Sequence, residues 1–224
     1  MFFTNLTFFS SLARANDAEQ ACIQAMTAPE ITISTSYGNL QYDHSKSRRS
    51  ITRLRLSRNK SGTLFKNLLN GLSTFEHSIN FSAKLTKHTL PSGITCVYPS
   101  SVTLHFGTGE DPVIYVAREY EEDTCMYKLV LRHEQIHQQI NQSVLEHYLP
   151  MIKQKFLEVV KNNVVVSKDY NISFAVAREE LKEKYLTILN PLLEEIKDKT
   201  KAEQNKLDRA ENYDYETAIC RETD

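Results

Sequence analysis

The chain has 224 residues and a formal net charge of −1, with 41% hydrophobic and 25% charged residues. This length allows one domain, or one compact body with an appendage, and is sufficient to bury a real core. The near-zero charge excludes a global field that would attract the chain to nucleic acid or to an anionic membrane, so we expect no nucleic-acid partner.

Residues 1–15 have the pattern of a signal peptide. An apolar stretch runs from Met1 through Phe9, and Ala13 and Ala15 match the small residues of an A-x-A cleavage site. The basic segment that usually precedes such a stretch is missing, so the alternatives are a truncated signal peptide, whose true start lies upstream of Met1, and an ordinary helix. No later stretch approaches the ~20 apolar residues that span a bilayer. We therefore predict a periplasmic or secreted protein without a membrane span.

Residues 16–120 are expected to be rich in β-strands. Ile31–Thr35 and Val102–Phe106 alternate between apolar and polar residues, and Val113–Val116 is a compact run of β-branched and aromatic residues. These three segments predict strands. Leu64–Leu72 is a candidate for a short helix between them.

The most basic part of the chain is residues 46–60, which contain five arginines between Arg48 and Arg58. Such a cluster invites a polyanion-binding interpretation. However, Arg53-Leu54-Arg55-Leu56 alternates as a half-exposed strand does, and we favour that reading.

The four cysteines are Cys22, Cys96, Cys125 and Cys220. They suit an oxidising compartment and allow three pairings, among which sequence does not choose. We prefer Cys22 with Cys220, near the two ends of the mature chain, and Cys96 with Cys125. A zinc–cysteine site is disfavoured because no C-x-x-C pair occurs, and free thiols are the alternative in the cytosol.

A long helix is predicted from Cys125. No Pro or Gly occurs before Pro150, and Asp123 or Thr124 can cap the start of the helix. Pro150 marks its end or a kink. Apolar residues recur at helical spacing, at Met126, Leu129, Val130, Ile136, Ile140, Val144 and Tyr148.

This helix contains the H-E-x-x-H sequence His133-Glu134-Gln135-Ile136-His137. Positions i and i+4 lie one above the other, so both imidazoles can bind one Zn²⁺ while Glu134 sits beside the open coordination position. Zinc lowers the pKa of bound water to about 7, and Glu134 would be the general base that activates it. We predict His133 and His137 as metal ligands and Glu134 as the catalytic residue; hydrogen-bonded core histidines on a structural helix are the alternative.

A helical hairpin is expected to follow. If the outgoing arm ends near Asn163 and the return begins near Ile172, residues 195–205 come back beside the H-E-x-x-H turn. The returning arm then supplies the third ligand.

Three acids of the returning arm are candidates for that ligand: Glu203, Glu211 and Asp214. They project close to the inward stripe of this arm, which includes Leu207 and Ala210. The alternative for each acid is a solvated position on a charge-mixed helix face.

Three segments resemble those of a known family. Leu131–His137, followed by a long helix and then Tyr213-Asp214-Tyr215-Glu216-Thr217, resembles a poorly characterised group of small exported bacterial zinc-dependent proteases. In that group an H-E-x-x-H helix is likewise followed by a Y-D-x-x-T element, and Tyr42–Ser47 resembles its N-terminal β-portion. The resemblance implies a zincin-like site and export. The group usually continues with His-Gly where this chain has Ala218-Ile219-Cys220, a departure that weighs against a third ligand from the C-terminal element.

Together these features predict an α+β fold in which residues 16–120 pack on a zincin-like helix within residues 121–224 to form one compact domain with a C-terminal helical hairpin. The predicted function is an exported zinc-dependent metallopeptidase that acts on a peptide or protein substrate. The alternative is a non-enzymatic exported binding or assembly protein, which presents the charged hairpin of residues 178–216 and has a structural metal site or none. The sequence indicates neither a particular substrate nor an oligomeric state.

Overall fold

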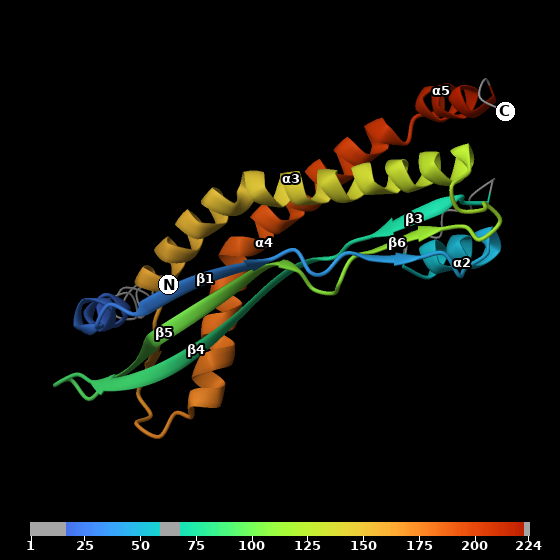
Figure 1. Ribbon diagram of the computed structural model, residues 1–224. Helices are drawn as coiled ribbons and strands as arrows, with labels where there is room; N and C mark the ends of the chain where they lie inside the picture. Colours follow the sequence, from blue (N-terminus) through green and yellow to red (C-terminus); the bar gives the residue numbers. More distant parts are fainter. Residues whose placement is uncertain (1–16, 59–67, 222–224) are drawn as a thin grey trace, which may run out of the picture. The chain divides into compact units, whose positions relative to one another are not determined.

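The computed structural model describes residues 17–58 and 68–221 (Figure 1). Residues 17–25 are helical. The predicted signal peptide, residues 1–15, lies outside the described part. The predicted α+β class is confirmed. The further elements in chain order are β1 (Glu30–Ser36), β2 (Gln41–Asp43), α2 (Arg48–Arg58), β3 (Gly71–Thr74), β4 (His77–Thr89), β5 (Thr95–Thr108), β6 (Val113–Val116), α3 (Cys125–Asn162), β7 (Val165–Ser167), α4 (Phe174–Leu207) and α5 (Ala210–Arg221).

The chain forms two compact units, and each is assembled from three separate segments. Among the described residues, unit 1 consists of residues 17–34, 80–105 and 149–194, and unit 2 consists of the described residues of segments 35–79, 106–148 and 195–221. Helices α3 and α4 therefore contribute residues to both units. None of the helices in the described ranges is long and apolar enough to cross a membrane.

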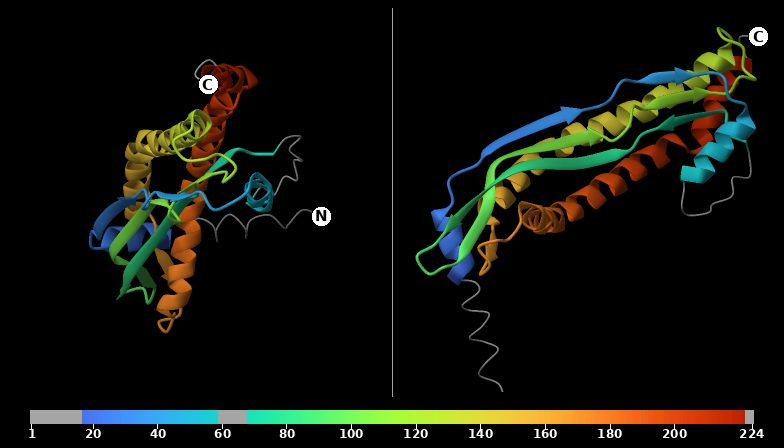
Figure 2. Two further views of the ribbon diagram at one scale, coloured as in Figure 1. Left: turned by 45° about the vertical axis from the view of Figure 1, so that its right-hand side comes forward. Right: turned by 90° about the horizontal axis from the view of Figure 1, so that it is seen from below.

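Unit 1 contains most of a sheet in which β1, β5 and β4 lie side by side (Figure 2). Strand β7 pairs with the start of β5, in an antiparallel register that places Val166 opposite Cys96. Cys22 of the N-terminal helix packs there against Tyr98 and Val164. The predicted strands at Ile31–Thr35 and Val102–Phe106 belong to this sheet and are confirmed.

Unit 2 contains the second sheet, with strand order β2-β6-β3. Its central strand is the predicted Val113–Val116 segment, which is confirmed. Because side chains alternate along a strand, Ile114 and Val116 pack on Val130 of α3, whereas Ala117 packs with Ile51 of α2. The sheet is therefore covered by α3 on one face and by α2 on the other.

Helix α2 corrects a prediction. Arg53–Leu56 forms part of this helix and is not a strand. Ile51 is buried and Leu54 packs in the same cluster, which is a helical spacing, and the Ser47 carbonyl accepts a hydrogen bond from Ile51 N–H. Two Arg-Leu repeats are too short to distinguish the two periods.

The predicted short helix at Leu64–Leu72 is not borne out at its end. Residues 64–67 lie outside the described ranges, and Leu72 belongs to strand β3. This end is extended because β3 pairs with β6, where Leu72 stands opposite Tyr115.

The predicted helix α3 begins at Cys125, and Thr124 is its cap. The Thr124 hydroxyl oxygen accepts a hydrogen bond from Tyr127 N–H at 3.3 Å. The helix continues through Pro150 to Asn162, and α4 begins at Phe174. Within unit 2 the two helices are antiparallel, because Tyr148 bonds Glu195 and Asn141 bonds Gln204. The predicted return of the chain beside the H-E-x-x-H helix is confirmed.

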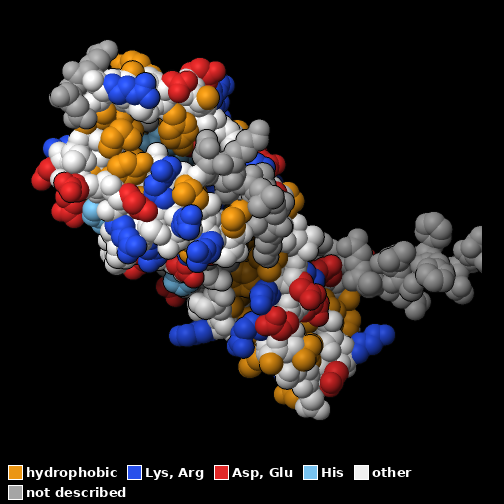
Figure 3. Space-filling model, turned by 90° about the vertical axis from the view of Figure 1, so that its right-hand side faces the viewer, with side chains coloured by type: hydrophobic (Ala, Val, Ile, Leu, Met, Phe, Trp, Pro, Cys, Tyr) orange, Lys and Arg blue, Asp and Glu red, His pale blue; other side chains and the backbone are white. Residues whose placement is uncertain are grey.

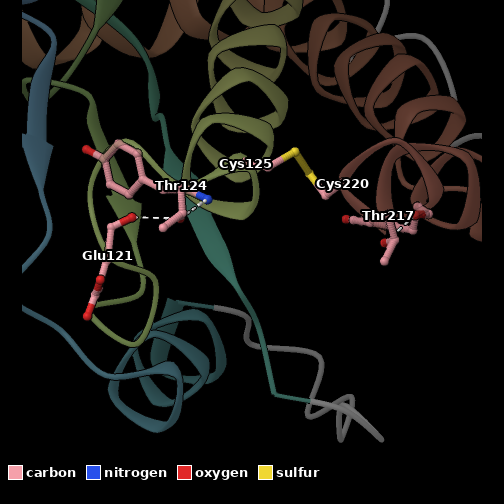
Figure 4. The surroundings of a disulfide bond; sticks show 7 residues. Glu121, Thr124, Cys125, Thr217 and Cys220 are labelled. Carbon is pink, nitrogen blue, oxygen red and sulfur yellow. Dashed lines mark hydrogen bonds between the residues drawn. A yellow bond between two sulfur atoms is a disulfide. The ribbon is translucent and has the colours of Figure 1, made fainter. Parts of the chain in front are cut away.

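The preferred cysteine pairing is wrong. The disulfides are Cys22–Cys96 in unit 1 and Cys125–Cys220 in unit 2. Figure 4 shows the second bond, which joins the start of α3 to α5. Each bond links residues that pack within one unit, and proximity to a chain end has no bearing on that packing.

Charged side chains of both signs occur on the surface of the protein. On the face shown in Figure 3, Lys and Arg side chains lie among Asp and Glu side chains, with hydrophobic ones between them. Surface charges of both signs are mixed on this face.

Candidate metal centre

The two histidines of the H-E-x-x-H helix face one carboxylate oxygen in unit 2. Oδ1 of Asp208 lies 3.2 Å from Nε2 of His133 and 3.0 Å from Nε2 of His137. The potential ligand atoms of these three residues lie within 4.8 Å of one another. His133 is 2% exposed and His137 is 8% exposed. The predicted pair of imidazoles therefore does converge, and its partner is an acid.

Asp208 lies at a break between two helices. Helix α4 ends at Leu207 and α5 begins at Ala210, which Figure 1 shows as separate helices. The side-chain amide of Asn212 donates hydrogen bonds to the carbonyls of Lys206 and Leu207 and so caps the end of α4. The carboxylate is placed by this cap and by its own contacts with the two histidines.

The sequence-based candidates for the third ligand are not at this site. Glu203 pairs instead with Lys199 and Lys206, whose hydrogen bonds lower its pKa to about 2. Glu211 and Asp214 are exposed in α5 and are not part of the group. The acid that reaches the two histidines is Asp208, which lies in the break between α4 and α5 and not on the face of either helix. A signal existed, because Asp208 stands between the predicted inward residues Leu207 and Ala210.

Glu134 is buried beside this group, with 7% of its surface exposed. Burial raises the pKa of its carboxyl to about 7, while the charges of His137 and His133 and a hydrogen bond from the Ser73 backbone act in the opposite direction. Strand β3 approaches so closely that a Cβ on Gly71 would lie 2.8 Å from Oε1 of Glu134. The strand therefore confines the carboxylate from one side.

Strand β3 is held on α3 by a side chain one turn further along. The amide of Gln138 donates hydrogen bonds to the Ser73 hydroxyl, at 2.6 Å, and to the Thr74 carbonyl, at 2.9 Å. This contact fixes the strand that confines Glu134.

Tyr213 completes the group, and sequence reasoning gave it no role at the site. Its hydroxyl donates a hydrogen bond of 3.1 Å to Oδ1 of Asp208 and lies 3.1 Å from Nε2 of His133. Its ring packs on the His133 ring, with 4.8 Å between the centroids. The tyrosine belongs to the Y-D-x-x-T element, so the family resemblance was the signal that marked this position.

The donor set could hold a divalent metal ion. Two imidazole nitrogens and a carboxylate oxygen are ligands of catalytic zinc sites, and three protein ligands leave one position for a substrate or water. The His137 Nδ1 atom is buried and has no hydrogen-bond partner within residues 17–58 and 68–221. The contact with Asp208 is thus the polar contact that orients this ring.

The pKa of Asp208 is set by the side chains that meet at its carboxylate. Burial raises the pKa of its carboxyl, but hydrogen bonds from His133, His137 and Tyr213 outweigh that effect and hold the pKa well below its usual range. The carboxylate is therefore ionised, as a metal ligand must be.

Comparisons of the chain with protein-family models, with curated proteins and with solved structures found no match. The interpretation of the site therefore rests on its own residues. Its buried side consists of His133, His137 and Glu134, and its exposed side consists of Asp208 and Tyr213.

Proposed function

We propose that this protein is a zinc-dependent metallopeptidase in which His133, His137 and Asp208 hold the ion. The observation that carries the proposal is the convergence of two Nε2 atoms and Oδ1 in one group. A zinc ion bound by such a set acts as a Lewis acid, which acidifies water and polarises a carbonyl group. We also propose that the site is zincin-like, because two of its ligands come from an H-E-x-x-H helix.

Glu134 is the general base. It lies next to His133 on α3, and its buried carboxylate is held by the Ser73 N–H and by the close approach of Gly71. The water oxygen forms a bond to the substrate carbonyl carbon and the C–N bond breaks. Glu134 accepts the proton of the water and delivers it to the leaving amine.

The place of action is outside the cytosol. Both disulfides support an oxidising compartment, because such bonds are rare where thiols are kept reduced. We therefore propose a periplasmic or secreted enzyme whose partner is a peptide or protein substrate.

The test of the site is metal analysis of purified variants. We expect about one zinc per wild-type chain, and loss of zinc in His137→Ala and Asp208→Asn. Glu203→Gln is the matched control, because this acid also lies in the returning arm but pairs with lysines. Full zinc retention in His137→Ala would show that His137 is not a zinc ligand.

The test of the chemistry is Glu134→Gln. This variant should keep its zinc and its fold, and it should hydrolyse a fluorescent peptide library ~10²–10⁴-fold more slowly than the wild type. Equal rates would remove Glu134 from the mechanism.

A structural metal in a non-catalytic binding or assembly protein is the second candidate. The observation that favours it is that the three ligands join α3 to the end of α4, so an ion there would also hold the two helices together. In that case zinc removal would unfold unit 2, and no member of the peptide library would be cleaved.

A further inference from the structure

The Tyr213 hydroxyl lies among the proposed ligand atoms but is not needed to complete a three-ligand site. It is 3.1 Å from Asp208 Oδ1 and 3.1 Å from His133 Nε2. We propose that Tyr213 is a catalytic residue that donates a hydrogen bond to the substrate carbonyl oxygen as negative charge develops on it. This inference rests on the metal centre proposed above.

The position of the hydroxyl is fixed before any substrate arrives. The Tyr213 ring packs on His133, and the Tyr213 carbonyl accepts a hydrogen bond from the Thr217 hydroxyl one turn later. The far end of α5 is joined to the start of α3 by the Cys125–Cys220 disulfide (Figure 4). A donor that needs no reorganisation stabilises developing charge most effectively.

Tyr213 also lies on the side from which a substrate can approach. Its exposed fraction is 42%, whereas His133, Glu134 and His137 are all below one tenth exposed. A carbonyl group that enters the group from this exposed side can contact the phenol. Its oxygen then meets the O–H that otherwise donates to Asp208.

The proposed step involves no covalent change at Tyr213. In the free protein the phenolic O–H donates a hydrogen bond to Asp208 Oδ1. When the carbonyl oxygen gains charge, the same O–H donates to it, and the proton remains on the phenol. A single donor of this kind contributes ~10²–10³-fold in rate.

The experiment compares wild-type protein with Tyr213→Phe, using Co²⁺ in place of zinc and acetohydroxamate as the anionic probe. Cobalt affinity is measured by competition with a chelator, and hydroxamate affinity by the change in the cobalt absorption spectrum. The matched control is Tyr215→Phe, which removes the same hydroxyl from a side chain that is 71% exposed on the same helix. Circular dichroism checks that all three proteins are folded.

We expect Tyr213→Phe to bind cobalt within about threefold of wild type and to bind acetohydroxamate ~10–100-fold more weakly, since a hydrogen bond to a charged oxygen is lost. Tyr215→Phe should match wild type in both. Equal hydroxamate affinity in Tyr213→Phe overturns the proposal. So does a cobalt affinity more than tenfold weaker, accompanied by a changed spectrum before the probe is added, because Tyr213 would then be a ligand.

The same measurements distinguish an error in the metal centre from an error in the role of Tyr213. If wild-type protein binds no cobalt, the proposed metal centre is wrong and the role of Tyr213 falls with it. If cobalt binds normally and the hydroxamate affinities are equal, the centre stands and the role of Tyr213 alone is wrong.

Discussion

The same pair of long helices buries aromatic side chains in unit 1, and in unit 2 it buries polar side chains beside apolar ones. In unit 1, Tyr185 of α4 packs on Phe156 of α3 and on Phe81 of β4. In unit 2, α3 and the end of α4 meet through polar groups, among them Asn141 with Gln204. Buried polar groups cost stability unless they are paired, whereas buried aromatic rings contribute to it. We infer that unit 1 stabilises the fold and that unit 2 carries the chemistry.

Unit 1 also buries a polar group, and unit 2 also has an apolar cluster. The Tyr185 hydroxyl in unit 1 is buried and has no hydrogen-bond partner in the described part of the chain. Burial raises the pKa of this phenol, which is therefore neutral. Unit 2 in turn has an apolar cluster of Ile114, Val116 and Val130, which supports the helix that carries the histidines.

The largest expected effect is loss of the aromatic contact in unit 1. Phe156 is fully buried, so Phe156→Ala should lower the free energy of unfolding by ~3–5 kcal/mol through lost burial and a cavity. Urea unfolding measures this loss. Zinc affinity, measured by chelator competition, should be unchanged; a parallel loss would show that the division of roles between the units is wrong.

The two disulfides give the next largest effect and the sharpest contrast. Removing either bond, as Cys22→Ser/Cys96→Ser or Cys125→Ser/Cys220→Ser, should cost ~2–4 kcal/mol of stability. The second bond holds α5, which carries Tyr213, so its loss should also weaken acetohydroxamate binding to the cobalt-loaded protein. Cys22→Ser/Cys96→Ser is the matched control. If both double variants weakened acetohydroxamate binding equally, the proposed role of the Cys125–Cys220 bond in positioning Tyr213 would be wrong.

A smaller effect is expected at the contact between β3 and Glu134. A Cβ on Gly71 would lie 2.7 Å from Cγ1 of Val130 and 2.8 Å from Oε1 of Glu134, so Gly71→Ala must displace one of them. We expect ~1–3 kcal/mol of destabilisation and reduced hydrolysis of the peptide library with zinc retained. Unchanged hydrolysis would show that β3 does not position Glu134.

The smallest effect concerns pH. Burial lowers the pKa of His77 in unit 2 to about 4, and the charge of Lys197 acts in the same direction. Nε2 of His77 lies 3.4 Å from Oγ1 of Thr200, whose hydroxyl donates a hydrogen bond to the Ile196 carbonyl. As the pH falls from about 6.5 to about 4, the unfolded chain binds a proton that the folded chain does not, so stability should fall by ~1–2 kcal/mol.

Urea unfolding at pH 7.5, 5.5 and 4.5 tests this. His77→Gln should show a shallower decline than wild type, because it lacks this titration. Identical slopes in the two proteins would remove His77 as a source of the pH dependence.

The periodicity of the sequence was sufficient to predict helices and strands whose structure depends on residues close together in the chain. The start of α3 at Cys125, its Thr124 cap and the shared face of His133 and His137 follow from residues within a few turns of one another. The β-branched segment Val113–Val116 is a strand for the same reason. The short alternation from Arg53 to Leu56 was insufficient, because its state depends on what Ile51 packs against.

The sequence by itself determined that two histidines share one helix face, with Glu134 at its edge, because positions i and i+4 of a helix lie one above the other. Only the tertiary structure decided which acid joins them. Asp208 reaches the histidines because α4 breaks after Leu207 while its register against α3 is set by contacts far apart in the chain. The cysteine pairing was decided in the same way. Long-range register depends on the sum of many packing contacts, and no local pattern records it.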